Sequence, residues 1–209
     1  MRSAIDGRIT AAAEKRLTGP VSVGIGMAPA LLDAATGHIP AVTIQAPSTS
    51  MCNLRDVSAT ASLTGVHRAR GGAADQGASA DITLTTQTFS ALLGNVASAH
   101  VTADPTAGDL SFALGPGGIL QVDETAALNG DTLTFSPASM SLMGGAAPAN
   151  LQATIDSKLT IRRQLSHLPL GLEPRSVAVT ASGVQLHLTA GPATIGAGQQ
   201  GQARHCAAS

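Results

Sequence analysis

The chain has 209 residues, of which 44% are hydrophobic and 12% charged, and its formal net charge is −1. With no Trp, no Tyr, three Phe and no excess of basic residues, it lacks the basic face and the stacking platforms of nucleic-acid-binding proteins, so we expect no nucleic-acid partner. Few charges among many aliphatic residues exclude disorder driven by charge, and no apolar run reaches the roughly 18–20 residues of a membrane-spanning helix.

The apolar residues are mostly small or aliphatic. There are 38 Ala but only 51 bulky residues, made up of 22 Leu, 11 Val, 10 Ile, 5 Met and 3 Phe. Aromatic side chains, which each bury about 150–250 Å², normally close the large gaps of a core. The composition therefore predicts either a flat, thin fold or an interior that is filled partly by something other than side chains.

The chain opens with a predicted amphipathic helix over residues 4–17, which a Gly-Pro pair ends. After Pro20 the apolar period changes to two, first over residues 21–27 and then repeatedly as far as residue 85. Apolar positions alternate there with Ser, Thr and Gly. This pattern predicts strands with one apolar face and one polar face.

The middle of the chain carries two local signals. Thr88 is the predicted N-cap of a short helix, and Asn129-Gly130 is a strong signal for a two-residue hairpin turn. The adjacent acids Asp123 and Glu124 precede that turn. In a strand they point to opposite faces, and we interpret them as a solvated strand end.

The last part of the chain contains the second main helix, predicted over about residues 149–159, where Leu151, Ile155 and Leu159 are four positions apart. A closing hairpin is predicted to follow. Residues 196–209 are rich in Gly, Gln and Ala and are predicted to form a flexible tail.

Together these patterns predict an α+β fold. About eight or nine strands, each with one apolar face, are typical of antiparallel sheet with one side in water. We expect a single domain over residues 1–195, in which a long, strongly curved antiparallel sheet wraps around one or two amphipathic helices.

No catalytic constellation is present in the sequence. It contains no G-x-S-x-G elbow and no H-x-x-x-H or H-E-x-x-H spacing, so we predict that the protein is not an enzyme and uses no cofactor and no metal. The two cysteines, Cys52 and Cys206, are too few for a zinc site. In an exported protein they are candidates for one disulfide, and in the cytosol they stay free thiols, so both alternatives remain open.

Four cations are candidates to meet an anionic lipid headgroup, provided that the loop over residues 168–174 lines an opening. They are Lys158, Arg162, Arg163 and Arg175. The alternative is a solvated helix end, where the helix dipole favours cations.

Aliphatic residues of the predicted strands and helices are candidates to line an acyl-chain site, because lipid sites are mostly apolar with few polar groups. For any one of them, ordinary core packing is the commoner role. The candidates are Val23, Ile25, Leu31, Leu32, Ile44, Leu84, Phe89, Leu92, Phe112, Leu114, Ile155 and Leu170.

Two other functions compete with lipid binding. A structural or interaction protein of the cell surface also uses strands rich in Ala, Gly, Ser and Thr, and predicts a dry core without a ligand. An enzyme acting on an envelope lipid or glycan requires clustered polar groups in a groove, which the sequence does not show.

The order of the segments resembles the LmeA-type phospholipid-binding family of the actinobacterial cell envelope. The similarity lies in three stretches between about residues 4 and 195: "VSVGIGMAPALLDAATGHIPAVTIQAP", "ADITLTTQTFSALLG" and "LPLGLEPRSVAVTASGVQLHLTA". Each stretch is degenerate, so the specificity of the resemblance lies in their order.

The resemblance implies a fold like half of a bactericidal/permeability-increasing-type protein, elongated and with a lipid-binding groove. It also implies a protein on the periplasmic or extracellular side of the envelope that binds a phospholipid or another acyl-chain lipid, contacts a membrane surface and supports lipid or lipoglycan homeostasis. We expect the signal or anchor segment of such a protein to be absent from this chain.

Overall fold

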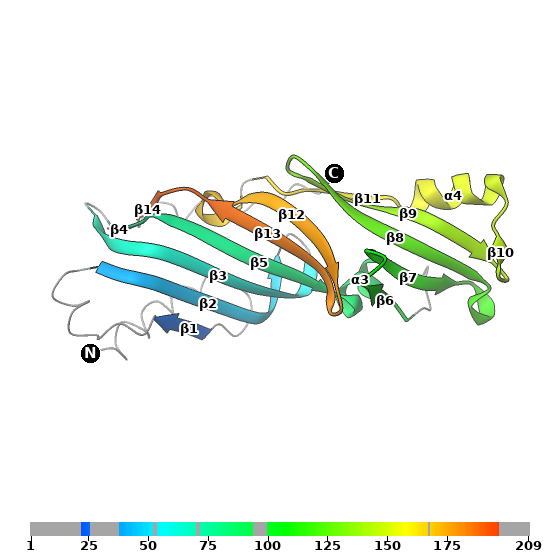
Figure 1. Ribbon diagram of the computed structural model, residues 1–209, viewed down its shortest axis with the longest axis horizontal. Coiled ribbons are helices and arrows are strands. Elements are labelled where there is room, and N and C mark those ends of the chain that lie inside the picture. The colour runs from blue at the N-terminus through cyan, green and yellow to red at the C-terminus, as the bar shows by residue number, and fades with distance from the viewer. Residues whose placement is uncertain are drawn as a thin grey trace. The chain divides into compact units, whose positions relative to one another are not determined.

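The computed structural model is built mainly from antiparallel strands (Figure 1). It describes residues 22–25, 38–51, 54–69, 72–93, 100–166 and 168–196. The predicted helix over residues 4–17 and both cysteines lie outside these ranges, as does all but the first residue of the predicted tail. None of the helices in the described part of the chain is long and apolar enough to cross a membrane.

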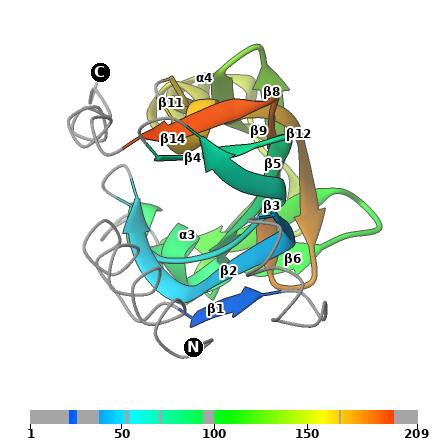
Figure 2. The ribbon, with the colours of Figure 1, turned by 90° about the vertical axis from the view of Figure 1, so that its left-hand side faces the viewer.

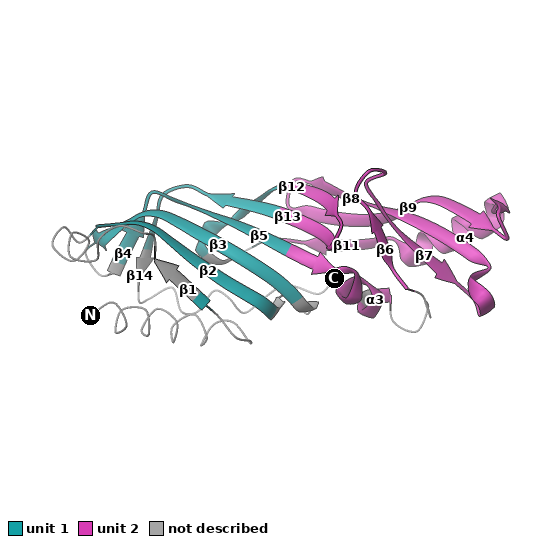
Figure 3. Cartoon of the chain, turned by 60° about the horizontal axis from the view of Figure 1, so that its bottom comes forward, with its two compact units in different colours: residues 1–82, 166–175, 187–207 teal, residues 83–165, 176–186, 208–209 magenta. Residues whose placement is uncertain are grey.

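The chain divides into two compact units (Figure 3). The first unit contains residues 1–82, 166–175 and 187–207, and the second contains residues 83–165, 176–186 and 208–209. Each unit is made of three segments that alternate along the sequence with those of the other, so neither unit is a continuous stretch of chain.

The larger of two sheets has eight strands. Six of them follow the order β1 (Ser22–Ile25), β2 (His38–Met51), β3 (Leu54–Ala69), β5 (Gly77–Thr85), β13 (Gly183–Ala190) and β12 (Glu173–Thr180). The other two are β4 (Gly72–Asp75), which pairs with β3, and β14 (Ala193–Gly196), which pairs with β4.

Strands β2 and β3 form a long hairpin that is curved (Figure 2). The pairing register shifts twice, between Ala46 and Thr49 and between Thr49 and Met51. Such irregularities bend a strand and increase its local twist. The alternation in the sequence places Val42 and Leu63 opposite each other, and both are buried.

The smaller sheet has six strands. Its order is β10 (Gly145–Ala146), β9 (Thr132–Leu142), β8 (Leu120–Asn129), β7 (Asp109–Leu114) and β6 (Thr102–Asp104), and β11 (Ile161–Gln164) also pairs with β9. The helices of the described chain are α3 (Thr86–Leu93) and α4 (Ala149–Leu159), with short 3-10 turns at η2 (Pro116–Gly118) and η3 (Pro169–Gly171).

All three phenylalanines of the chain meet in the core of the second unit. Phe89 of α3 lies with its ring centroid 5.2 Å from that of Phe135 in β9 and 6.3 Å from that of Phe112 in β7. Tilted aromatic pairs at these distances are favourable beyond the area that they bury. Each side chain is essentially inaccessible to solvent, so this cluster anchors α3 to the sheet.

The structure confirms the antiparallel, one-faced character of the strands, but it differs from the prediction of one long sheet. The strands form two sheets, because β5 leads into α3 instead of pairing with β6. The second main helix is α4, with the expected bounds.

Two local predictions are wrong by one to three residues. The cap of α3 is Thr85, whose Oγ1 accepts a hydrogen bond from the backbone N–H of Thr88 at 3.1 Å. A threonine at either position has the side-chain oxygen that caps a helix, and α3 begins directly after Thr85. The β8–β9 turn consists of Gly130 and Asp131, since Asn129 pairs with Thr132.

Candidate functional site

An apolar cluster in the first unit has a small buried centre and a wider, partly exposed border. Its centre is Val42, Leu63 and Ala78, on β2, β3 and β5. Six partly buried residues pack against this centre: Ile39, Ile44, Val66, Leu170, Leu172 and Ala190. Among the described residues, part of the aliphatic surface of the six border residues therefore remains exposed around this small buried centre.

The loop over residues 168–174 contributes to this cluster through Leu170 and Leu172. Leu170 has a φ of 61°, a left-handed conformation that costs a non-glycine residue roughly 1–2 kcal/mol. Asn or Gly would adopt it more easily, yet the chain holds a leucine there against the apolar cluster.

The predicted acyl-chain lining residues fall into three groups. Ile44 and Leu170 come together in the apolar cluster of the first unit. Leu84, Phe89, Phe112 and Leu114 are buried in ordinary cores, and Ile155 is half-buried on α4. Leu31 and Leu32, together with the side chains of Val23, Ile25 and Leu92, lie outside what the structure describes. Lipid contact by these residues stays a prediction.

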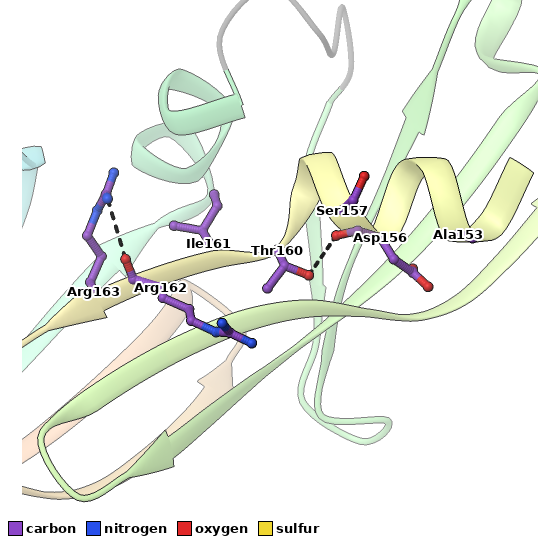
Figure 4. Close-up of a pocket in the computed structure, with 7 residues that line it drawn as sticks. All are labelled: Ala153, Asp156, Ser157, Thr160, Ile161, Arg162 and Arg163. Carbon is purple, nitrogen blue, oxygen red and sulfur yellow. Dashed lines mark hydrogen bonds between the residues drawn. The ribbon is translucent and has the colours of Figure 1, made fainter. Parts of the chain in front are cut away.

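A surface pocket of about 750 Å³ lies where α4 ends and β11 begins (Figure 4). Its lining residues are Ala153, Asp156, Ser157, Thr160, Ile161, Arg162 and Arg163. Two guanidinium groups and one carboxylate leave the pocket with one net positive charge. The hydroxyl of Thr160 donates to the backbone oxygen of Asp156 at 2.7 Å, which ends the helix and fixes the start of β11.

Two of the four predicted headgroup cations, Arg162 and Arg163, line this pocket. They are neighbours on one strand, so their side chains point to opposite faces, with Arg162 exposed and Arg163 half-buried (Figure 4). Lys158 is exposed in the last turn of α4. Arg175 belongs to the first unit, where it pairs with Glu173 at 3.0 Å and donates from Nε to Thr189 Oγ1 at 2.8 Å.

The interpretation of Asp123 and Glu124 as a solvated strand end is half wrong. They do point to opposite faces, and Asp123 accepts hydrogen bonds from Ser111 Oγ at 2.6 Å and Ser139 Oγ at 2.5 Å. Glu124, however, is 0% exposed, and neither carboxylate oxygen has a hydrogen-bond partner. Burial raises the pKa of Glu124 to about 7.

Sequence reasoning missed Glu124, although a signal was present. The residue continues the alternating series of Leu120 and Val122, both buried, and so falls on the apolar face of β8. A register shift in the β8–β9 pairing lies next to it, between Asp123 and Glu124. The apolar face of this sheet therefore carries one buried acid with a raised pKa.

Comparison with known proteins gives one match. The sequence model of the LmeA-like phospholipid-binding family matches residues 1–189. No curated protein and no solved structure matches the chain. Because the family match covers most of its length, the chain belongs to the LmeA-like phospholipid-binding family.

Proposed function

We propose that this protein is a non-enzymatic lipid-binding protein of the cell envelope, on its periplasmic or extracellular side. It binds a phospholipid or another acyl-chain lipid and thereby supports lipid or lipoglycan homeostasis. The observation that carries the proposal is the partly exposed apolar cluster of the first unit, in a chain that belongs to a phospholipid-binding family.

An acyl chain supplies the apolar surface that this cluster lacks. Each buried CH₂ group of a lipid contributes about 0.8 kcal/mol, and a protein this poor in aromatic residues has few large side chains of its own with which to cover the cluster. Ile44 and Leu170 lie on different elements, β2 and η3, so a chain seated on the cluster contacts both. The left-handed Leu170 then has a role that offsets its strain.

The pocket between α4 and β11 suits a phosphodiester. Arginine binds phosphate oxygens through a planar fork of donors, and one net positive charge matches the single negative charge of a phosphodiester. Asp156 in the same pocket disfavours more highly charged anions. The pocket belongs to the second unit and is argued by itself, separately from the apolar cluster of the first unit. It requires only the arginines at its lining, not all four predicted cations.

Lipid retention by the purified full-length chain tests the proposal. We expect native mass spectrometry to show a bound lipid and a short-chain fluorescent phospholipid to be taken up from monomeric solution. Recovery of no lipid together with no uptake would overturn the proposal and favour the cell-surface structural protein without a ligand.

Leu170→Asn tests whether Leu170 contributes to lipid retention separately from its contribution to the stability of the fold. Asn accepts a positive φ, which offsets the packing that Leu170 makes with the cluster, so the unfolding free energy should change by no more than about 1 kcal/mol, while retention should weaken about tenfold through loss of the apolar contact with lipid. Met143→Asn is the matched control, because Met143 (φ 52°) is the other non-glycine residue with positive φ among those described. Equal retention by the two variants would contradict a role for Leu170.

A further inference from the structure

Two large apolar side chains are exposed in the described part of the chain, and they are neighbours. Met143 is 83% exposed and Ile119 is 46% exposed. The backbone N–H of Met143 donates to the carbonyl oxygen of Ile119 at 2.8 Å. The two residues therefore form one feature, although 24 positions separate them in the sequence.

This feature is one end of the smaller sheet. Leu120 pairs with Leu114 on one side and with Leu142 on the other. The turns that follow Leu114 and Leu142, at residues 115–119 and 143–144, therefore lie at the same end of the sheet, where Figure 1 shows η2 and β10. We call residues 115–119 and 143–144 the apolar tip.

The conformation of the tip does not suit its apolar residue. Met143 and Gly144 connect β9 to β10 with φ values of 52° and 80°. Two successive positive φ values are typical of the hairpin turn that favours Asn-Gly. A methionine there is strained, and strain of this kind concentrates at functional sites.

The tip is also free of charge. No charged residue occurs between Asp109 and Asp123 or between Asp131 and Asp156. The first turn of α4, which follows the second turn of the tip, has no acidic residue either. A surface of this kind has no charge to pair with a protein partner and none that an anionic lipid surface repels.

We propose that the apolar tip inserts into the interface of a phospholipid bilayer, with the side chains of Met143 and Ile119 among the lipid. The inference rests on the proposed function, since a protein that binds phospholipid takes it from a bilayer or returns it to one. A second copy of the chain is a poor occupant, because a stable protein interface needs about 800 Å² and roughly 20–30 residues from each partner. Shallow insertion needs only a few apolar side chains.

Met143→Trp tests the insertion directly, since the chain has no other Trp. With vesicles of phosphatidylcholine and phosphatidylglycerol, the Trp emission should shift to the blue, and lipids that carry a quencher near the glycerol backbone should quench it. An unchanged emission would overturn the proposal. A blue shift that follows protein concentration without vesicles would also overturn it, in favour of a second copy.

Met143→Asn tests the same proposal by removing the apolar side chain that is expected to insert into the bilayer. Asn relieves the strained φ, so the variant should fold at least as well, and its partition onto the same vesicles should fall about tenfold. The control is Ala127→Asn, which adds the same amide at an exposed position on β8 near the other end of the sheet. Equal partition of the two variants would contradict insertion of the tip.

Retention of a monomeric short-chain phospholipid distinguishes the two proposals. Met143→Asn should keep wild-type retention while losing vesicle partition. If the wild type retains no lipid but the Trp emission still shifts, the proposed function is wrong and insertion is supported. If retention is intact and the emission does not shift, insertion alone is wrong.

Discussion

The buried carboxyl of Glu124 should make the stability of the protein depend on pH. Burial raises the pKa of Glu124 from its ordinary value of 4.5 to about 7. The folded protein therefore holds this proton more tightly than the unfolded chain does. The resulting stabilisation is complete below pH 4.5, is lost as the pH rises from 4.5 to 7, and stays lost above pH 7.

The size of the loss follows from the same two values. Each pKa unit is worth about 1.4 kcal/mol of differential stability, so a rise from 4.5 to about 7 corresponds to about 3 kcal/mol. Glu124→Gln keeps the shape of the neutral acid but has no proton to lose. Relative to the wild type, this variant should therefore gain about 3 kcal/mol of unfolding free energy between pH 4.5 and pH 8.

Urea unfolding followed by far-ultraviolet circular dichroism measures this difference. Comparing the two proteins at each pH cancels other titrating groups, including Asp109, whose pKa is raised by burial and by the carboxylates of Asp123 and Asp104. Glu173→Gln makes the same chemical change at an exposed position, where it removes only a surface ion pair with Arg175 worth at most about 1 kcal/mol, so its difference from the wild type should stay within about 1 kcal/mol at every pH. If the unfolding free energy of Glu124→Gln depended on pH in the same way as that of the wild type, Glu124 could not be a buried acid with a raised pKa.

Four further substitutions test the packing of the second unit by urea unfolding. Gly183→Ala should destabilise by more than about 2 kcal/mol, because the new Cβ would lie 2.1 Å from the carbonyl oxygen of Leu84 and the φ is +134°; an unchanged midpoint would contradict this close approach. Phe89→Ala should lose about 3–5 kcal/mol through the cavity it leaves, and a loss near 1 kcal/mol would show that the aromatic cluster is loosely packed. Thr85→Ala should lose about 1 kcal/mol, whereas Thr85→Ser, which keeps the capping oxygen, should lose less, so equal losses would contradict the cap at Thr85.

The sequence predicted the elements that local periodicity determines. Helix α4 and the one-faced strands follow from side-chain spacing alone, which each segment carries by itself. The turn consists of Gly130 and Asp131, one residue later than the predicted Asn129-Gly130 turn, because strand pairing selects the register. Only Gly130 of these two residues has a positive φ. The division into two sheets depends on which distant strands pair, and no short pattern encodes that choice.

The candidate site was predictable only in part. Ile44 and Leu170 were both among the predicted lining residues, but nothing in the sequence indicated that β2 and η3 bring them together. Glu124 and Met143 were missed because each contradicts the local rule for its position. An acid stands on an apolar face, and an apolar residue stands at a turn position that favours Asn. Such conflicts become visible only when burial and backbone angles are known.

The clustering of every phenylalanine in one place has a spectroscopic consequence. With no Trp and no Tyr in the chain, the aromatic bands in the near-ultraviolet circular dichroism of the protein come from three Phe rings, and all of them belong to the second unit. The far-ultraviolet signal comes from the strands of both units. Loss of the fine phenylalanine bands at a lower urea concentration than the strand signal would therefore show the second unit unfolding first, without any label or added chromophore.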